Sequence, residues 1–332
     1  MFQDWGWHGK RSVKGKYDDF RDVMVIHFSA MRLHNATGMR LLAAWFVLLE
    51  HSPRLLGLEG TKWGGWGLAI FFSLSGYMIS QSARRSRNPW DFTMRRARRL
   101  GPAYIVAVLG TTLIVWPLFS HPPGFHLGGG TLLSGMYGIL RWEFPGLFLT
   151  HMLRSANGSV WSLPYEILMY GFLGVLWFGW LRRTRLHGAI VPATIWGIST
   201  ILLLGGDRIL PGGDFKLGGI RVYYLVNFLA LFAGGWTLAE SNPSQRTLRW
   251  ILLAVFLLRL ALFAFPYEQD AVDAMLIPLG VVAIGHLPIS PNRFLPDWSY
   301  GFYLWAWPVQ QCLLDRFPRC SPAELTLGRR RR

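Results

Sequence analysis

Residues 40–51 read RLLAAWFVLLEH, an apolar run that begins with an arginine and ends with a glutamate and a histidine. Nine of the ten residues between Arg40 and His51 are apolar. Eleven positions make about three turns of an α-helix, so the two side chains lie on one stripe, about 16 Å apart along the axis. Because roughly 20 apolar residues cross a bilayer, the run predicts a membrane helix with ionisable groups at its mouth and near its middle.

The composition of the whole chain is that of a polytopic membrane protein. Of its 332 residues, 52% are hydrophobic and 15% aromatic, and 17 are tryptophan. Apolar stretches of membrane length recur and predict an all-α transmembrane bundle of about nine spans. The expected spans are 41–57, 64–82, 101–119, 161–181, 188–205, 220–239, 250–265, 271–288 and 298–315.

The basic excess follows this topology. The net charge is +16, and alternate loops hold 20 Lys and Arg on one side of the predicted membrane and 7 on the other. The positive-inside rule then places the N-terminus in the cytoplasm, and no nucleic-acid partner is needed to explain the charge. Cys312 and Cys320 offer no metal-ligand spacing, so no metal is expected.

We expect three parts in the chain: a cytoplasmic segment 1–33, a transmembrane domain 34–316 and a basic tail 317–332. Within the second, residues 131–153 are expected to be interfacial or re-entrant. In a nine-span bundle the sequence GRRRR at 328–332 would lie outside, against the positive-inside rule. A tenth span is therefore expected to be missing at the C-terminus.

His51 and Arg40 are the first candidate site residues. Ionisable groups at membrane depth usually face a cavity or a partner, which favours a functional site. The alternative is a buried histidine satisfied by a carbonyl of a neighbouring helix. Glu50 points about 100° away from His51, so we expect it to serve a second helix.

Two further stretches carry alternatives that the residues leave open. In GLAIFFSLSGYMIS, residues 67–80, small residues allow close helix packing, and Ser73 or Ser75 could bond across the interface. The seven arginines of 84–102 could contact anionic lipid or hold the phosphates of a donor from the cytoplasm.

Residues 157–170, NGSVWSLPYEILMY, predict a helix start. Ser162 suits the N-cap, and Pro164 falls in the first turn. Glu166 and Tyr170 then share a face, and the carboxylate either pairs with a cation or reaches the outer interface. Far along the chain, Arg259 is expected to extend to a thinned interface.

Taken in order, these features resemble the acyltransferase-3 family of bacterial integral-membrane acyltransferases, from about Arg32 to Pro308. The matching motifs are Arg40 with His51, FFSLSG at 71–76, Arg96 and Arg99 followed by Pro102, WSLPYE at 161–166 and the aromatic SYGFYLWAWPV at 299–309.

The resemblance implies transfer of an acyl group, most often acetyl, from cytoplasmic acyl-CoA to a hydroxyl of a cell-envelope sugar or glycoside at the bacterial inner membrane. The histidine of the family carries over to His51, as general base or transient acyl carrier. Arg40 would hold the donor or orient the site, and Arg96 and Arg99 are placed for the donor phosphates. Glu166 joins the catalytic group, and Glu50, Ser75, Trp161, Tyr170 and Trp305 are expected to support substrate or structure.

The chain also departs from the family pattern. The family usually has an acidic residue where Thr37 stands and a histidine where Ala306 stands, and it usually ends with another span. These departures raise an inactive, truncated acyltransferase as an alternative. A second alternative is a transporter or glycan export component, in which Arg40, His51 and Glu166 would form a proton or substrate path.

Overall fold

The computed structural model describes residues 33–120, 143–144, 146–182, 188–206, 209–210, 215–262, 269–287 and 297–327. The predicted cytoplasmic segment up to residue 32, the first part of the predicted interfacial stretch and the sequence GRRRR lie outside these residues. The end of that stretch, 146–153, is described and consists of turns and bends with an isolated bridge between Leu147 and Ser120.

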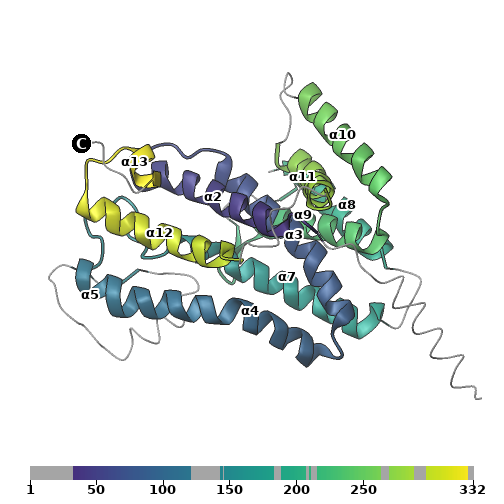
Figure 1. Ribbon diagram of the computed structural model, residues 1–332, viewed down its shortest axis with the longest axis horizontal. Helices are drawn as coiled ribbons and strands as arrows, with labels where there is room; N and C mark the ends of the chain where they lie inside the picture. The colour runs from purple at the N-terminus through teal and green to yellow at the C-terminus, as the bar shows by residue number, and fades with distance from the viewer. Residues whose placement is uncertain are drawn as a thin grey trace, which may run out of the picture. The chain divides into compact units, whose positions relative to one another are not determined.

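The described chain is helical apart from a short β-hairpin, as predicted (Figure 1). Each of the nine predicted spans falls on a helical segment. The segments are α2 (Ala36–Leu55), α3 (Trp63–Arg85), α4 (Pro89–Gly110) continued by η1 (Thr111–Val115) and α5 (Trp116–Phe119), η2 (Gly158–Ser162) continued by α7 (Leu163–Leu176) and η3 (Trp177–Leu181), α8 (Ile190–Leu204), α9 (Val222–Ser241), α10 (Gln245–Leu262), α11 (Gln269–Gly285) and α12 (Ser299–Arg316).

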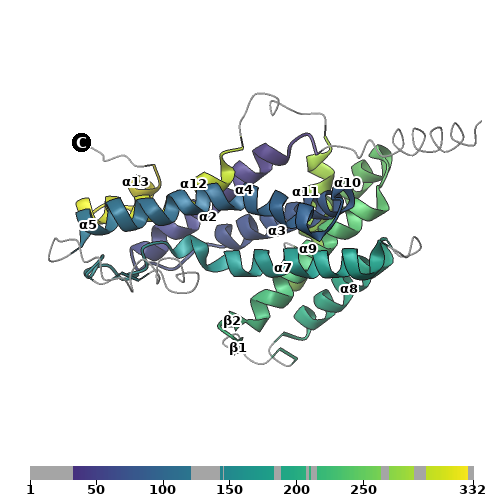
Figure 2. The same cartoon turned by 90° about the horizontal axis from the view of Figure 1, so that it is seen from below.

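Three of these segments are long and apolar enough to cross a membrane by length and composition alone. Among the described residues they are Pro89–Phe119, Gly158–Leu181 and Val222–Ser241, and α8 is a shorter apolar helix. The antiparallel hairpin pairs β1 (Lys216–Leu217) with β2 (Ile220–Arg221) and leads directly into α9 (Figure 2).

Helices α3 and α9 cross at backbone contact. A Cβ atom on Gly76 would lie 1.9 Å from the carbonyl oxygen of Phe232, and one on Gly235 would lie 2.0 Å from that of Ser73. Small residues therefore set this crossing, as the stretch 67–80 predicted. The Ser73 hydroxyl donates within its own helix, to the Ala69 carbonyl at 2.8 Å.

The start of α7 differs in one detail from its prediction. Pro164 lies in the first turn and Ser162 stands at the N-cap position, but the Ser162 hydroxyl does not cap the helix. It bonds the Tyr303 hydroxyl at 2.8 Å instead. The capping role falls to Asn157, whose side chain accepts a hydrogen bond from the Ser159 N–H at the start of η2. The pattern thus predicted the start of the helix correctly. It was wrong that the Ser162 hydroxyl caps the helix, because this hydroxyl bonds Tyr303 instead.

The Arg259 side chain forms an ion pair with Asp273 of α11, which also accepts a hydrogen bond from the Trp66 indole at 3.1 Å. Its expected place at a thinned interface stays a prediction. A carboxylate on the neighbouring helix satisfies the charge where it is.

At the C-terminal end, the expected basic tail contains a short helix, α13 (Pro322–Leu327), which packs on α2 (Figure 1). Leu325 is buried there beside Leu55, and the Thr326 hydroxyl lies 2.6 Å from that of Ser52. This segment therefore belongs to the packed body of the protein.

Candidate functional site

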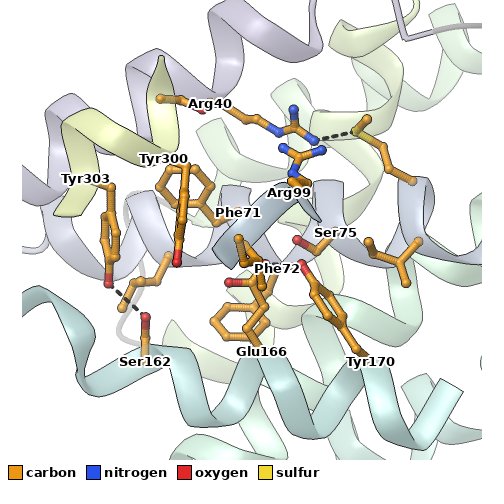
Figure 3. A pocket seen from close by; sticks show the side chains of 15 residues that line it. Arg40, Phe71, Phe72, Ser75, Arg99, Ser162, Glu166, Tyr170, Tyr300 and Tyr303 are labelled. Atoms are coloured by element: carbon orange, nitrogen blue, oxygen red, sulfur yellow. Dashed lines mark hydrogen bonds between the residues drawn. The ribbon is translucent and has the colours of Figure 1, made fainter. Parts of the chain in front are cut away.

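A pocket lies where α2, α3, α4, α7 and α12 meet (Figure 3). Phe71, Phe72 and Leu68 give it apolar walls from α3. Its polar and aromatic lining comes from every one of these helices and comprises Arg40, Ser75, Arg99, Glu166, Tyr170, Tyr300 and Tyr303. Residues from all five motifs therefore converge on one place.

Asp297, just before α12, holds two arginines of this pocket. Its carboxylate accepts from Arg40 Nη1 at 2.6 Å and from Arg99 Nη2 at 3.2 Å. Arg40 also points its Nη2 at the Met78 sulfur, 2.8 Å away. Burial opposes the charge of Asp297, but Arg40, the Ser299 hydroxyl and Arg99 outweigh it and lower the pKa of the carboxyl below its ordinary value. Asp297 is therefore an anion that fixes both guanidinium groups.

Glu166 is a second acidic residue of the pocket. It accepts a hydrogen bond from the Tyr170 hydroxyl one turn later, as the shared face predicted. Ser75 of α3 and Arg40 and Arg99 line the same pocket. The pairing of Glu166 with a cation stays a prediction.

Arg96 lies beside the pocket, one helical turn before Arg99. Its Nη2 donates to the Ser82 hydroxyl at 3.1 Å, whereas its buried Nε has no hydrogen-bond partner. A buried N–H of a guanidinium is rarely left unpaired in a folded protein. The residue is therefore chemically suited to an incoming anion such as a phosphate.

His51 lies outside the pocket lining. Its ring is 5% exposed and meets the Trp307 ring edge-on, with centroids 4.8 Å apart. Its Nδ1 is buried without a hydrogen-bond partner. The alternative prediction, a structural histidine that donates to a carbonyl of a neighbouring helix, therefore does not hold for this nitrogen. Because Arg40 contacts Asp297 and His51 contacts Trp307, α2 and α12 run in the same direction. The pocket and His51 are two places along this pair of helices.

The remaining predicted site residues do not line the pocket and make packing or hydrogen-bond contacts elsewhere. Glu50 accepts from Arg54 at 2.5 Å and from Thr61 at 2.6 Å, which ties the end of α2 to the connection before α3. Trp161 packs edge-on against Tyr165 and Tyr224 and at a tilt against Phe228. Trp305 packs on Gly110 of α4, where a Cβ would come within 2.3 Å of its ring.

Sequence reasoning missed Asp297, Tyr300 and Tyr303. The Tyr303 hydroxyl bonds both Ser162 and the Ser159 carbonyl, so it joins α12 to the start of α7. Asp297 lies 257 positions from Arg40. Its one sequence signal was an acidic residue immediately before an aromatic span, where α12 would place it at a helix mouth.

The chemistry available here is that of group transfer with anion binding. Among the residues that the structure describes, no cluster of three or more His, Cys, Asp or Glu could hold a metal. The pocket instead offers arginines, a carboxylate that orients them and tyrosine hydroxyls, with a buried imidazole further along α2.

Known proteins match the chain over most of its length. A family model described as an acyltransferase domain matches residues 33–323. The O-acetyl transferase of Shigella phage Sf6 is 29% identical over 294 residues, which cover 83% of this chain and 84% of the phage protein. The exopolysaccharide production protein ExoZ of Rhizobium meliloti is 25% identical over an alignment that covers 78% of this chain and 80% of ExoZ.

The peptidoglycan O-acetyltransferase OatA of Listeria monocytogenes is 27% identical over an alignment of 326 residues that covers 85% of this chain and 50% of that protein. The chain therefore spans about half the length of this larger relative. No solved structure matches the chain. The family match confirms the resemblance seen in the motifs: the chain belongs to the acyltransferase-3 family of polytopic membrane enzymes and is an acyltransferase.

Proposed function

We propose that the protein transfers an acyl group, acetyl by preference, from cytoplasmic acyl-CoA to a hydroxyl of a cell-envelope carbohydrate. It would act in the bacterial inner membrane with its N-terminus in the cytoplasm. The names of two relatives support the acceptor class, a peptidoglycan O-acetyltransferase and an exopolysaccharide production protein. The O-acetyl transferase of the phage supports the acetyl group. The orientation rests on the loop charges, 20 against 7.

The observation that carries this proposal is the separation of the arginines from His51 along one pair of helices. Arg40 and Arg99 meet Asp297 at one end of α12, and His51 meets Trp307 about three turns further on. Acyl-CoA has phosphates at one end and its thioester at the end of a long arm. A site for it needs cations and a reactive group that are far apart, and this chain has that arrangement.

The residues fit an anionic donor. The buried, unpartnered Nε of Arg96 offers a donor to a phosphate oxygen, and Arg99 adds a second guanidinium one turn later. Asp297 keeps Arg40 and Arg99 together, while Phe71 and Phe72 exclude water from the pocket wall. Bound acyl-CoA supplies a thioester whose carbonyl carbon is the electrophile.

His51 would supply the proton chemistry. In the direct route, the acceptor hydroxyl oxygen bonds to the acyl carbon as the C–S bond breaks, and the hydroxyl proton passes through His51 to the departing thiolate. In the alternative, His51 first carries the acyl group itself. Both routes need an imidazole nitrogen that no neighbour occupies, and the unpartnered Nδ1 meets that need.

The test is mass spectrometry of envelope glycans from a host with the gene deleted, restored, and restored with His51→Gln. We expect an acyl mass increment that disappears on deletion and returns only with the unaltered gene. His286→Gln is the matched control, because His286 is also buried but bonds Tyr77 and the Val282 carbonyl and does not line the pocket. It should restore the increment.

Protein abundance in the membrane is measured for every strain. Identical glycans in all strains, with the protein present, would refute the proposal and favour a non-catalytic membrane protein. An increment that His51→Gln restores in full would keep the activity but remove His51 from it.

A further inference from the structure

A second histidine, His151, contacts the C-terminal end of α12 from the turns that precede η2. His151 stacks on Phe148 with centroids 4.9 Å apart and planes 7° apart. Its Nδ1 lies 2.6 Å from Gln311 Oε1, and its Nε2 lies 3.6 Å from Asp315 Oδ1. The side chain of His151 is 6% exposed and that of Asp315 is 22% exposed, so the pair opens to the surface at the carboxylate.

Gln311 fixes which nitrogen of His151 carries the proton. The Gln311 amide N–H groups donate to the Leu153 carbonyl at 2.6 Å and the Ser155 carbonyl at 3.0 Å. Both of its donors are therefore used, so Oε1 must accept, and His151 Nδ1 must be the N–H that donates to it. The lone pair of the neutral ring is then on Nε2, on the side that faces Asp315.

When the ring is neutral, Nε2 and the Asp315 carboxylate are two acceptors that face each other. At 3.6 Å they are too far apart for a direct hydrogen bond and close enough to bind donors that lie beside or between them. Hydroxyl groups on neighbouring carbons of a sugar ring are such donors, since each can point its hydrogen at one acceptor.

The backbone at this place is strained in a way that serves the histidine. Phe148 is fully buried and has a φ of +51°, a region that bulky side chains rarely adopt. Such strain gathers at functional sites. Here it places the ring on which His151 stacks.

The cluster lies on the same stripe of α12 as the pocket. Residues three or four apart share a helix face, and Tyr303, Trp307, Gln311 and Asp315 follow one another at that spacing. Trp307 contacts His51 and donates to the Ser155 carbonyl, the same carbonyl that Gln311 contacts. His51 and His151 therefore meet consecutive turns of one helix.

Buried polar atoms without partners gather around these turns. They are His51 Nδ1, Gln310 Oε1 and Ser159 Oγ. Gln310 itself bonds Ser52 of α2, and Ser159 adjoins Tyr303. Each unpaired atom is costly in the absence of a polar partner. Unpaired polar atoms therefore lie along the turns of α12 between Tyr303 and Gln311.

We infer that His151 and Asp315, oriented by Gln311 and Phe148, form an acceptor subsite that binds a pair of neighbouring hydroxyls of the carbohydrate. This inference rests on the proposed function and names how its acceptor is held. His151 and Asp315 are positioning residues here, while the reacting hydroxyl is a further one that lies toward His51.

The test distinguishes effects on binding of the carbohydrate acceptor from effects on binding of the acyl donor. Thiol release from acetyl-CoA is measured in membrane vesicles while the envelope polysaccharide of the deletion strain is varied. His151→Phe, which retains stacking on Phe148, and Asp315→Asn should each raise the KM for polysaccharide about tenfold or more. The KM for acetyl-CoA should stay at the wild-type value. Asp270→Asn removes a carboxylate that bonds Tyr223 instead and is the matched control, with both KM values unchanged.

Equal KM values for polysaccharide in wild type, His151→Phe and Asp315→Asn would overturn the subsite. An equal rise in both KM values would assign the cluster a structural role only. If His151→Phe does not accumulate, Asp315→Asn decides, because it alters the exposed end. Absence of polysaccharide-dependent thiol release in the wild type would instead refute the proposed function, and binding of the polysaccharide to immobilised wild type and Asp315→Asn would still test the subsite.

Discussion

Replacement of Gly76 by alanine tests how the fold places the pocket. The added Cβ would lie 1.9 Å from the Phe232 carbonyl oxygen, whereas ordinary contact begins at 3.4 Å, so α3 and α9 must separate by about 1.5 Å. The obstacle is backbone, which no rotamer change can relieve. Overpacking of this kind costs typically 1–3 kcal/mol, and we expect the upper end of that range.

The activity should fall further than the stability. Gly76 follows Ser75, and the same helix carries Phe71 and Phe72 into the pocket. A displacement of about 1 Å at a catalytic site can reduce the rate on the order of 100-fold. Gly76→Ala protein that still folds should therefore transfer acyl groups roughly 100-fold more slowly than the wild type.

The assays are thermal unfolding in detergent and thiol release from acetyl-CoA with polysaccharide. Gly171→Ala is the control, because Gly171 lies within α7 and a Cβ there meets nothing within 4 Å. That change should stabilise the helix by roughly 0.5–1 kcal/mol. Wild-type unfolding and wild-type activity in Gly76→Ala would show that α3 and α9 do not cross at Gly76 and would refute the reasoning.

Three further predictions concern the site. Asp297→Asn should weaken acetyl-CoA binding, and it should reduce the loss of thermal stability at acid pH. Because the pKa of Asp297 is lowered in the folded protein, the wild-type carboxylate stabilises the fold fully above about pH 3.9. This stabilisation is lost as the pH falls through the pKa of the folded protein. Thermal midpoints between pH 3 and 7 check this, and parallel curves would contradict it. Glu166→Gln keeps an acceptor for Tyr170 but removes the predicted pairing with a cation, so the rate of acyl transfer should fall at least tenfold. An unchanged rate would assign Glu166 to packing. Trp307→Phe removes the hydrogen bond to Ser155, worth about 1 kcal/mol, and should lower kcat without a change in the KM for acetyl-CoA. A change in that KM alone would place Trp307 at the donor.

The helices were predictable because hydropathy is a local property. The nine expected spans all fall on helical segments, and the small residues at 67–80 predicted the close crossing of α3. Partners across the fold were not predictable in this way. The ion pair of Arg259 with Asp273 depends on the packing of α10 on α11, and the hydroxyl of Ser162 was taken from the helix end by Tyr303.

The candidate site was predicted in part for the same reason. Motif order brought Arg40, Arg99 and Glu166 into one list, and the structure brings them into one pocket. The anion that joins the arginines, Asp297, comes from 257 positions away, and no periodicity in α2 could identify it. The spacing of Arg40 and His51 correctly predicted a shared stripe, but only α12 reveals that the two face different neighbours.

The parallel run of α2 and α12 gives the site a direction. Both helices begin at the arginines that Asp297 holds, and both lead past Tyr303 to His51 and Trp307. The first and ninth spans of a bundle cross the membrane in the same sense, so this contact agrees with a nine-span topology. Because Tyr303 is bonded to Ser162 and to the Ser159 carbonyl, it separates the pocket from the region around His51. In the proposed reaction, a donor that enters at the arginines would pass this tyrosine to reach the imidazole, so Tyr303 would lie between the donor phosphates and His51.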